Sequence, residues 1–164
     1  MMIKHINRPS NYCFLKTCRE GTARQVKLLL DEGVDVNVID EDDRRTSLIE
    51  ACLGGSVEIV DLLLKNGVHI NAVDNYGNTA LVYACAGGFI KIVKLLLQYD
   101  ADIKRYGYKA LEEACDNNHI EIVIFLIDQG ISVRGASIYL MNACNKGFTE
   151  IVQLLLNNAA DFNF

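Results

Sequence analysis

The sequence predicts a mainly α-helical solenoid of five helix-turn-helix units joined by β-hairpin-like fingers. A short segment with a cysteine in a fixed place occurs five times in one register, at offsets of 34, 33, 30 and 29 residues. A second apolar run follows each segment. Because neither helix of such a unit can bury its apolar face alone, the units must stack to form a core. The first segments begin at Phe14, Leu48, Leu81, Leu111 and Leu140, and the second runs span residues 26–30, 59–64, 92–97, 122–127 and 151–156.

The second unit shows the expected helix pair most clearly. Leu48, Ala51 and Cys52 follow the i, i+3, i+4 spacing that places side chains on one face of a helix. Residues 59–64 form a broad apolar stripe for the second helix. Between them, Gly55 can adopt the backbone angles of a helix C-terminal cap. The pattern therefore predicts two antiparallel helices joined by a tight turn.

An extended arm and a finger are expected to connect each unit to the next. Residues 68–71 alternate apolar and polar side chains, and residues 74–77 have the composition of a hairpin turn. Asn78 or Thr79 is then expected to cap the next helix. The last two connections are short, so the fingers should shrink toward the C-terminus. The predicted divisions are an N-terminal tail at 1–11 and units at 12–45, 46–78, 79–108, 109–137 and 138–164.

Composition excludes several classes of protein. Half of the 164 residues are hydrophobic, but the longest apolar stretches are interrupted by lysines and are shorter than the roughly 20 residues of a membrane span. The N-terminus has no apolar core of a signal peptide. We therefore expect a cytoplasmic protein, with the nucleus as the alternative, that does not bind membranes. The net charge of −5 argues against binding to nucleic acid.

Cysteine occupies the same slot in every unit, next to a small residue. Stacked helices lie about 8–10 Å apart, whereas a disulfide requires Cα atoms about 5.5 Å apart, so this cysteine column should not crosslink itself. The sequence contains no CxxC motif and no zinc-ligand spacing. We interpret the thiols as small buried residues, which favours a reducing compartment. The column consists of Cys18, Cys52, Cys85, Cys115 and Cys144.

Other chemistry is weakly represented. His5, His69 and His119 fall in non-adjacent units, and the acidic residues 40–43 lack the glycine and spaced glutamate of a calcium loop. We therefore expect no catalytic residues, no metal, no cofactor and no enzyme activity. The alternative is a thiol-based sensor or enzyme that uses the cysteine column, which would need accessible thiols of low pKa.

Positions that differ between units are free to contact a partner. On the first helix of each unit these slots share one face, opposite the packed one. The central units carry small and apolar side chains there, flanked by charge, which suits an inserted partner side chain. Tyr83 and Leu53 are the predicted anchors, and Tyr76 and Tyr106 the predicted finger-tip residues closing over them. The predicted binding set is Glu50, Leu53, Gly54, Tyr76, Tyr83, Ala86, Gly87, Tyr106 and Glu113.

The chain resembles the ankyrin-repeat family. The matching features are Thr46-Ser47-Leu48 and Thr79-Ala80-Leu81, the repeated Ala-Cys pair, the turn glycines and the Ile-Val…Leu-Leu-Leu runs. The resemblance implies an ankyrin-repeat solenoid that binds a protein or peptide partner through its concave groove and fingers. We expect this chain to act as an adaptor, scaffold or inhibitor and to be a monomer. It also implies that Asn37 and Asn71 are candidates for asparagine hydroxylation. A targeting segment of a larger protein is a further alternative.

Overall fold

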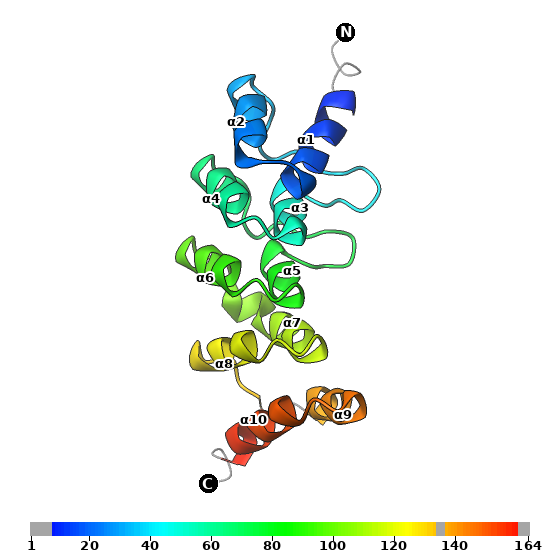
Figure 1. Cartoon of the computed structure of the whole chain (residues 1–164), viewed down its shortest axis with the longest axis vertical. Helices are drawn as coiled ribbons and strands as arrows, with labels where there is room; N and C mark the ends of the chain where they lie inside the picture. The colour runs from blue at the N-terminus through cyan, green and yellow to red at the C-terminus, as the bar shows by residue number, and fades with distance from the viewer. Residues whose placement is uncertain (1–7, 134–136, 161–164) are drawn as a thin grey trace.

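The computed structural model describes residues 8–133 and 137–160, which form a column of stacked helix pairs (Figure 1). The odd-numbered helices make one layer, here called the inner helices, and the even-numbered outer helices make the other. Two long loops extend from the side of the inner helices. The helices are α1 (Arg8–Glu20), α2 (Ala23–Asp31), α3 (Ser47–Gly54), α4 (Val57–Lys65), α5 (Ala80–Ala86), α6 (Ile90–Gln98), α7 (Ile103–Asp116), α8 (Ile120–Asp128), α9 (Ser137–Lys146) and α10 (Thr149–Ala160).

Side-chain caps define the starts of helices α2 to α5. The hydroxyls of Thr46, Ser56 and Thr79 accept hydrogen bonds from backbone N–H groups in the first turns of α3, α4 and α5. Each cap satisfies a donor that has no partner within its own helix. Thr79, rather than Asn78, caps α5. Gly55 ends α3 with a φ of 73°, so the predicted glycine cap is confirmed.

Two helices begin earlier than the sequence indicated. Helix α1 begins at Arg8, within the predicted tail, and α7 begins at Ile103, six residues before the predicted unit boundary at 109. The side chain of Asp102 accepts a hydrogen bond from the backbone N–H of Arg105 at 3.0 Å, which starts α7 there. The predicted finger at 105–108 is therefore the first part of a helix. The expected shortening of this connection is confirmed, but no finger remains.

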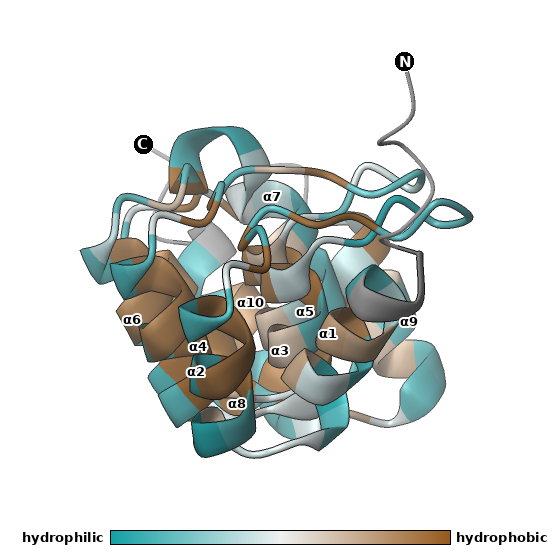
Figure 2. Ribbon diagram, turned by 90° about the horizontal axis from the view of Figure 1, so that it is seen from above, coloured by the Kyte–Doolittle hydropathy of each residue, from teal (hydrophilic) through white to brown (hydrophobic). Residues whose placement is uncertain are grey.

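The first finger (residues 38–45) and the second finger (residues 72–78) are loops rather than β-hairpins. The described residues contain one isolated bridge, between Ile39 and Thr46, and no strand. Asn75 instead links the two fingers, since its side chain donates to the carbonyl oxygen of Asp42 at 2.7 Å. Its backbone N–H donates to the carbonyl oxygen of Asp43 at 3.0 Å. Figure 2 shows hydrophilic residues at the finger tips and apolar residues where the helix layers meet.

Burial of the cysteine column depends on the neighbouring unit. Cys18, Cys52, Cys85 and Cys115 are buried, as predicted, but Cys144 is exposed. Two other slots of the fifth unit behave in the same way. Met141 and Leu156 are exposed, whereas the corresponding residues of the second unit, Ile49 and Leu64, are buried. The expectation that Cys144 is buried is wrong because, among the described residues, no sixth unit covers its face.

An aromatic ring at the turn of one unit packs against a turn glycine of the unit before it. The ring of Phe89 lies so close to Gly55 that a Cβ atom on this glycine would be 2.6 Å from the ring. A Cβ atom on Gly87, in the same unit as Phe89, would lie 2.4 Å from the same ring. His119 repeats the contact one unit later, against Gly88. Gly55 is thus required both for its positive φ and for the space above it.

We expect Gly55→Ala to destabilise the fold more than Gly67→Ala. Both glycines have positive φ, but no atom lies within 4 Å of a Cβ at Gly67. Gly67→Ala should cost about 1 kcal/mol of backbone strain, and Gly55→Ala about 1–3 kcal/mol more because Phe89 must move. Urea unfolding of the two variants measures the difference. Equal free energies of unfolding would contradict the packing of Phe89 on Gly55.

A second prediction concerns the alkaline stability of the fold. Burial raises the pKa of the Cys85 thiol to about 12, from an ordinary value of 9.0. Above about pH 9 the unfolded chain therefore loses a proton that the folded chain keeps. Unfolding then releases a proton, and the free energy of unfolding falls by about 1.4 kcal/mol per pH unit for each such thiol.

Replacement of this thiol should make that fall shallower. Between pH 9 and 11, Cys85→Ala should lower the slope of unfolding free energy against pH by about 1.4 kcal/mol per pH unit. Cys13→Ala, at an exposed site, is the matched control and should leave the slope unchanged. Urea titrations at several pH values supply the measurement. A slope unaffected by Cys85→Ala would show that this thiol is not kept protonated by the fold.

Candidate functional site

The predicted binding residues lie on the inner helices and on the second finger. Helix α3 carries three of them, α5 carries two and is followed directly by Gly87, and α7 carries two more. Tyr76 lies at the tip of the second finger. Their arrangement follows from the stacking, since α3, α5 and α7 contact one another in order along the inner layer. The residues thus share one side of the column but differ widely in exposure.

Tyr83 fastens the second finger to α5. Its half-buried ring carries a hydroxyl that donates to Oδ2 of Asp74 at 2.6 Å. Asp74 is only 4% exposed, and its Oδ1 accepts from the backbone N–H groups of Tyr76 and Asn78, both at 2.9 Å. The guanidinium of Arg45 lies over the ring, 5.9 Å from its centroid. Burial and the hydrogen bond to Asp74 raise the pKa of Tyr83, so the hydroxyl stays protonated.

Glu50 joins the first two units. Its carboxylate is 3.5 Å from the guanidinium of Arg19 on α1, and the residue is only 9% exposed. Burial raises the pKa of Glu50, while the charges of Arg19 and Arg45 oppose that shift. Glu50 is therefore the buried partner of an ion pair between α3 and the exposed Arg19 of α1, as well as part of the predicted surface.

The small and apolar slots lie where neighbouring elements approach closely. A Cβ atom at Gly54 would lie 2.1 Å from the carbonyl oxygen of Arg19, so this glycine lets the backbones of α1 and α3 meet. Leu53 is half-buried against the core. Ala86 is also half-buried, and its carbonyl oxygen lies 2.9 Å from Nε2 of His119. Because the side chains at these slots are small, little projects from the inner face here, and Leu53 and Ala86 remain partly accessible.

The two tyrosines predicted at finger tips have different environments. Tyr76 is 64% exposed at the tip of the second finger, and its carbonyl oxygen accepts a hydrogen bond from Lys109 at 2.8 Å. Tyr106 lies within α7, half-buried against the core, with the Arg105 guanidinium 5.3 Å from its ring centroid. The prediction that Tyr106 closes over the groove from a finger is wrong because α7 begins at Ile103. Glu113, also on α7, is half-buried.

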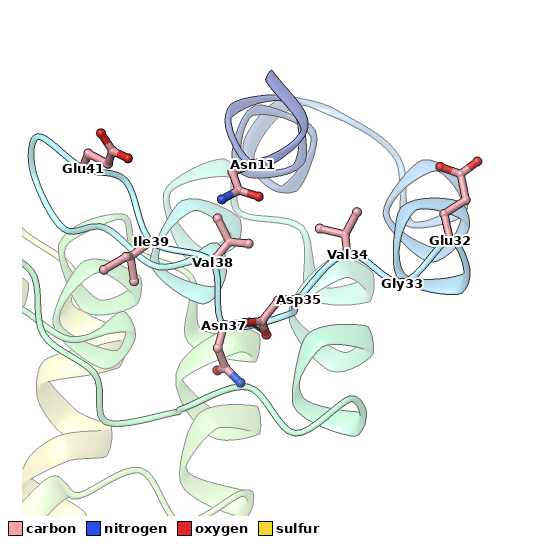
Figure 3. A pocket seen from close by; sticks show the side chains of 9 residues that line it. All are labelled: Asn11, Glu32, Gly33, Val34, Asp35, Asn37, Val38, Ile39 and Glu41. Atoms are coloured by element: carbon pink, nitrogen blue, oxygen red, sulfur yellow. Dashed lines mark hydrogen bonds between the residues drawn. The ribbon is translucent and has the colours of Figure 1, made fainter. Parts of the chain in front are cut away.

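Three adjoining hollows lie between α1 and the first finger, at a place that the sequence interpretation missed. The largest, of about 600 Å³, is bordered by Asn11 of α1, the end of α2 and the chain up to Glu41 (Figure 3). Hollows of about 300 Å³ and 230 Å³ continue from it past Tyr12 to Glu50. We call this run the N-terminal groove. It is lined by residues of α1 (11–20), the arm after α2 (32–37), the first finger (38–42) and Glu50.

Two large apolar side chains are exposed in this groove. Tyr12 is 66% exposed and Ile39 is 42% exposed. The sequence contained one signal for Tyr12, since it occupies the slot that is a capping threonine, Thr46 or Thr79, in the next two units. The sequence interpretation did not use this difference, because Tyr12 directly follows the predicted N-terminal tail at 1–11.

The described residues hold few groups suited to catalysis. Within residues 8–133 and 137–160, no group of three histidine, cysteine or acidic side chains could hold a metal ion. All six cysteines are free, and burial raises the pKa values of the thiols of Cys18, Cys52, Cys85 and Cys115. No helix in this part of the chain is long and apolar enough to span a membrane.

The two candidate hydroxylation sites have matching environments. Oδ1 of Asn37 accepts a hydrogen bond from the backbone N–H of His69 at 2.8 Å. One unit later, Oδ1 of Asn71 accepts from the backbone N–H of Asp102 at 2.9 Å. Both amides therefore hold the next arm in place. Hydroxylation of either residue stays a prediction.

Comparison with known proteins agrees with the architecture. A family model described as ankyrin repeats (3 copies) matches residues 14–106 and 73–137, which together cover most of the chain. No curated protein matches the sequence. Ankyrin repeats are in general protein–protein interaction modules and are typically noncatalytic. The stacked helix pairs, the capped starts of the inner helices and this match together show that the chain belongs to the ankyrin-repeat family.

Proposed function

We propose that this chain is a noncatalytic module that holds a protein partner on its inner helices and finger tips, as an adaptor, scaffold or inhibitor. The observation that carries the proposal is the placement of exposed large apolar side chains. Tyr12 and Tyr108 lie on inner helices, and Ile39, Val73 and Tyr76 lie on the fingers. Aromatic side chains within a polar surface are typical of the energetically important residues of protein interfaces.

The fingers are ordered before any partner arrives. Asp74 and Tyr83 hold the second finger on α5, and Asn75 ties the second finger to the first. A preformed surface loses less conformational entropy on binding than a mobile one, which favours affinity. Leu53 and Tyr83, at the base of the fingers, support the exposed residues and remain part of the proposed contact surface.

The thiol-sensor alternative receives little support from the chemistry of the column. Burial raises the pKa of Cys18 to about 12, and the same cause raises that of Cys115 to about 12. Protonated, enclosed thiols are poor nucleophiles. Free thiols are typical of a reducing compartment, which supports the proposed cytoplasmic setting. We therefore favour binding over thiol chemistry.

The proposal is tested with single substitutions and a captured partner. The intact chain serves as bait, the recovered protein is purified, and its affinity is measured by calorimetry. Tyr76→Ser and Leu53→Arg should each weaken binding by about 2 kcal/mol if these residues are hot spots. Ile124→Ser, which removes an exposed apolar side chain from the outer helix α8, is the matched control and should change binding by less than about 0.5 kcal/mol.

Circular dichroism checks that each variant remains folded. Loss of binding with Ile124→Ser, together with full binding by Tyr76→Ser and Leu53→Arg, would move the interface to the outer helices and refute the proposed surface.

The tether of the second finger gives a separate prediction. Asp74→Ala removes the acceptor for Tyr83 and for two backbone N–H groups, so amide hydrogen exchange at residues 75–78 should become faster. Tyr83→Phe removes only the hydroxyl and should have a smaller effect at the same amides. Exchange in α8 is the internal reference. Unchanged exchange in Asp74→Ala would show that the finger is held by other contacts.

A further inference from the structure

The N-terminal groove is one continuous run because neighbouring hollows share lining residues. The largest and the middle hollow share Asn11, Ile39 and Glu41. The middle and the smallest hollow share Tyr12, Leu15 and Asp40. The run therefore leads from the end of α2, beside α1, to Glu50 on α3. A shape of this kind suits an extended segment of polypeptide.

The middle of the groove offers a place for one apolar side chain. Tyr12 and Ile39 both line the middle hollow while remaining largely exposed, and the buried side chain of Leu15 lies with them. In the second and third units the slot of Tyr12 is a buried threonine cap. In the first unit the helix begins at Arg8, four residues before Tyr12, so this slot lies inside a helix and needs no cap. An aromatic side chain can therefore occupy it.

The lining of the groove is strongly acidic. Seven carboxylates and two basic side chains border the three hollows, and one of the basic groups, Arg19, already pairs with Glu50. Oδ1 of Asp40 accepts hydrogen bonds from the backbone N–H groups of Asp42 and Asp43, at 2.9 Å and 2.8 Å. This turn leaves the side chain of Asp42 exposed at the finger tip. The resulting negative potential attracts lysine and arginine and repels acidic partners.

We propose that the N-terminal groove binds an extended basic segment of a partner protein. An apolar side chain of that segment lies between Tyr12 and Ile39, and flanking lysine or arginine side chains pair with Asp40 and Asp42. The assignment rests on the proposed function and extends it, because it names the chemistry of the partner and the end of the array that binds it. Charge complementarity selects this occupant over an acidic or purely apolar one.

The test is a titration of the isotope-labelled full chain with a synthetic peptide, in which NMR chemical shifts of the chain are measured at each step. The peptide carries a central leucine with two arginines on each side, between glycine spacers. Shifts should concentrate at residues 11–20 and 38–42. Higher salt should weaken binding because exposed charge pairs are screened. Peptides with glutamate for arginine, or asparagine for leucine, should bind much more weakly.

Matched variants separate the groove from general electrostatics. Asp42→Lys should lower the affinity for the peptide about fivefold, and Tyr12→Ser should lower it about tenfold. Glu150→Lys makes the same charge change on α10, and Tyr99→Ser removes an exposed tyrosine from the end of the outer helix α6. Both controls should stay within about twofold of the unaltered chain. Equal weakening by Asp42→Lys and Glu150→Lys would overturn the assignment.

Two further outcomes would also overturn it. The first is that a chain beginning at Arg8 binds the peptide whereas the full chain does not. That result would mean that the chain's own residues 1–7 occupy the groove. The second is no peptide binding by either chain. If a captured protein partner still depends on Tyr76 and Leu53 in that case, the proposed function stands and only the groove assignment fails. If the protein partner ignores those residues as well, both fail.

Discussion

Stacking of one unit on the next is the constraint on which the rest of the structure depends. The same slots are buried or exposed according to whether a neighbour covers them, as a comparison of Ile49 and Leu64 with Met141 and Leu156 shows. Full burial of such a side chain stabilises a fold by about 1.5–3 kcal/mol. The second, third and fourth units receive that stabilisation at most of their apolar slots, and the fifth unit receives only part of it. The repeated small residue and cysteine follow from the same constraint, because inner helices in contact leave little space between them.

Hydrogen bonds across the units follow the spacing of the stack. In place of a β-ladder, single side chains reach the backbone of the next unit, from Asn37 to His69 and from Asn71 to Asp102. In the opposite direction along the array, the ammonium group of Lys109 donates a hydrogen bond to the carbonyl oxygen of Tyr76. Arms without paired strands would otherwise leave these backbone groups without partners in the protein. The regular stacking of the helices thus places each amide opposite the group it binds.

The sequence was sufficient to predict the helix pairs of the repeated units and the burial of the first four members of the cysteine column, because these features depend on residues that recur at similar spacings. It was insufficient where the outcome depends on a single contact or on a missing neighbour. The cap supplied by Asp102 moved the start of α7 and placed Tyr106 in a helix. Exposure of Cys144 depends on what covers the last described unit, which no residue within that unit encodes.

The candidate site was harder to predict than the fold for a related physical reason. An aromatic residue at a variable slot suggests an exposed anchor, but Tyr83 directs its hydroxyl to Asp74, nine residues away along the chain. Only the folded finger brings these two groups together. Tyr12 shows the opposite case, since an early start of α1 frees its slot from capping.

Variation in this array therefore has two distinct consequences. Where a variable side chain can reach a finger, as at Tyr83, it stabilises the surface on which a partner would bind. Where stacking and capping make no demand, as at Tyr12, Ile39 and the acidic tip of the first finger, side chains remain exposed and set the chemistry of that surface. The positions named here lie on the inner helices and fingers, although Ile124 on the outer helix α8 is exposed as well. The first finger, beside the first inner helix, is the place where exposed apolar area and concentrated charge coincide, and it gives the array its chemically most distinctive surface.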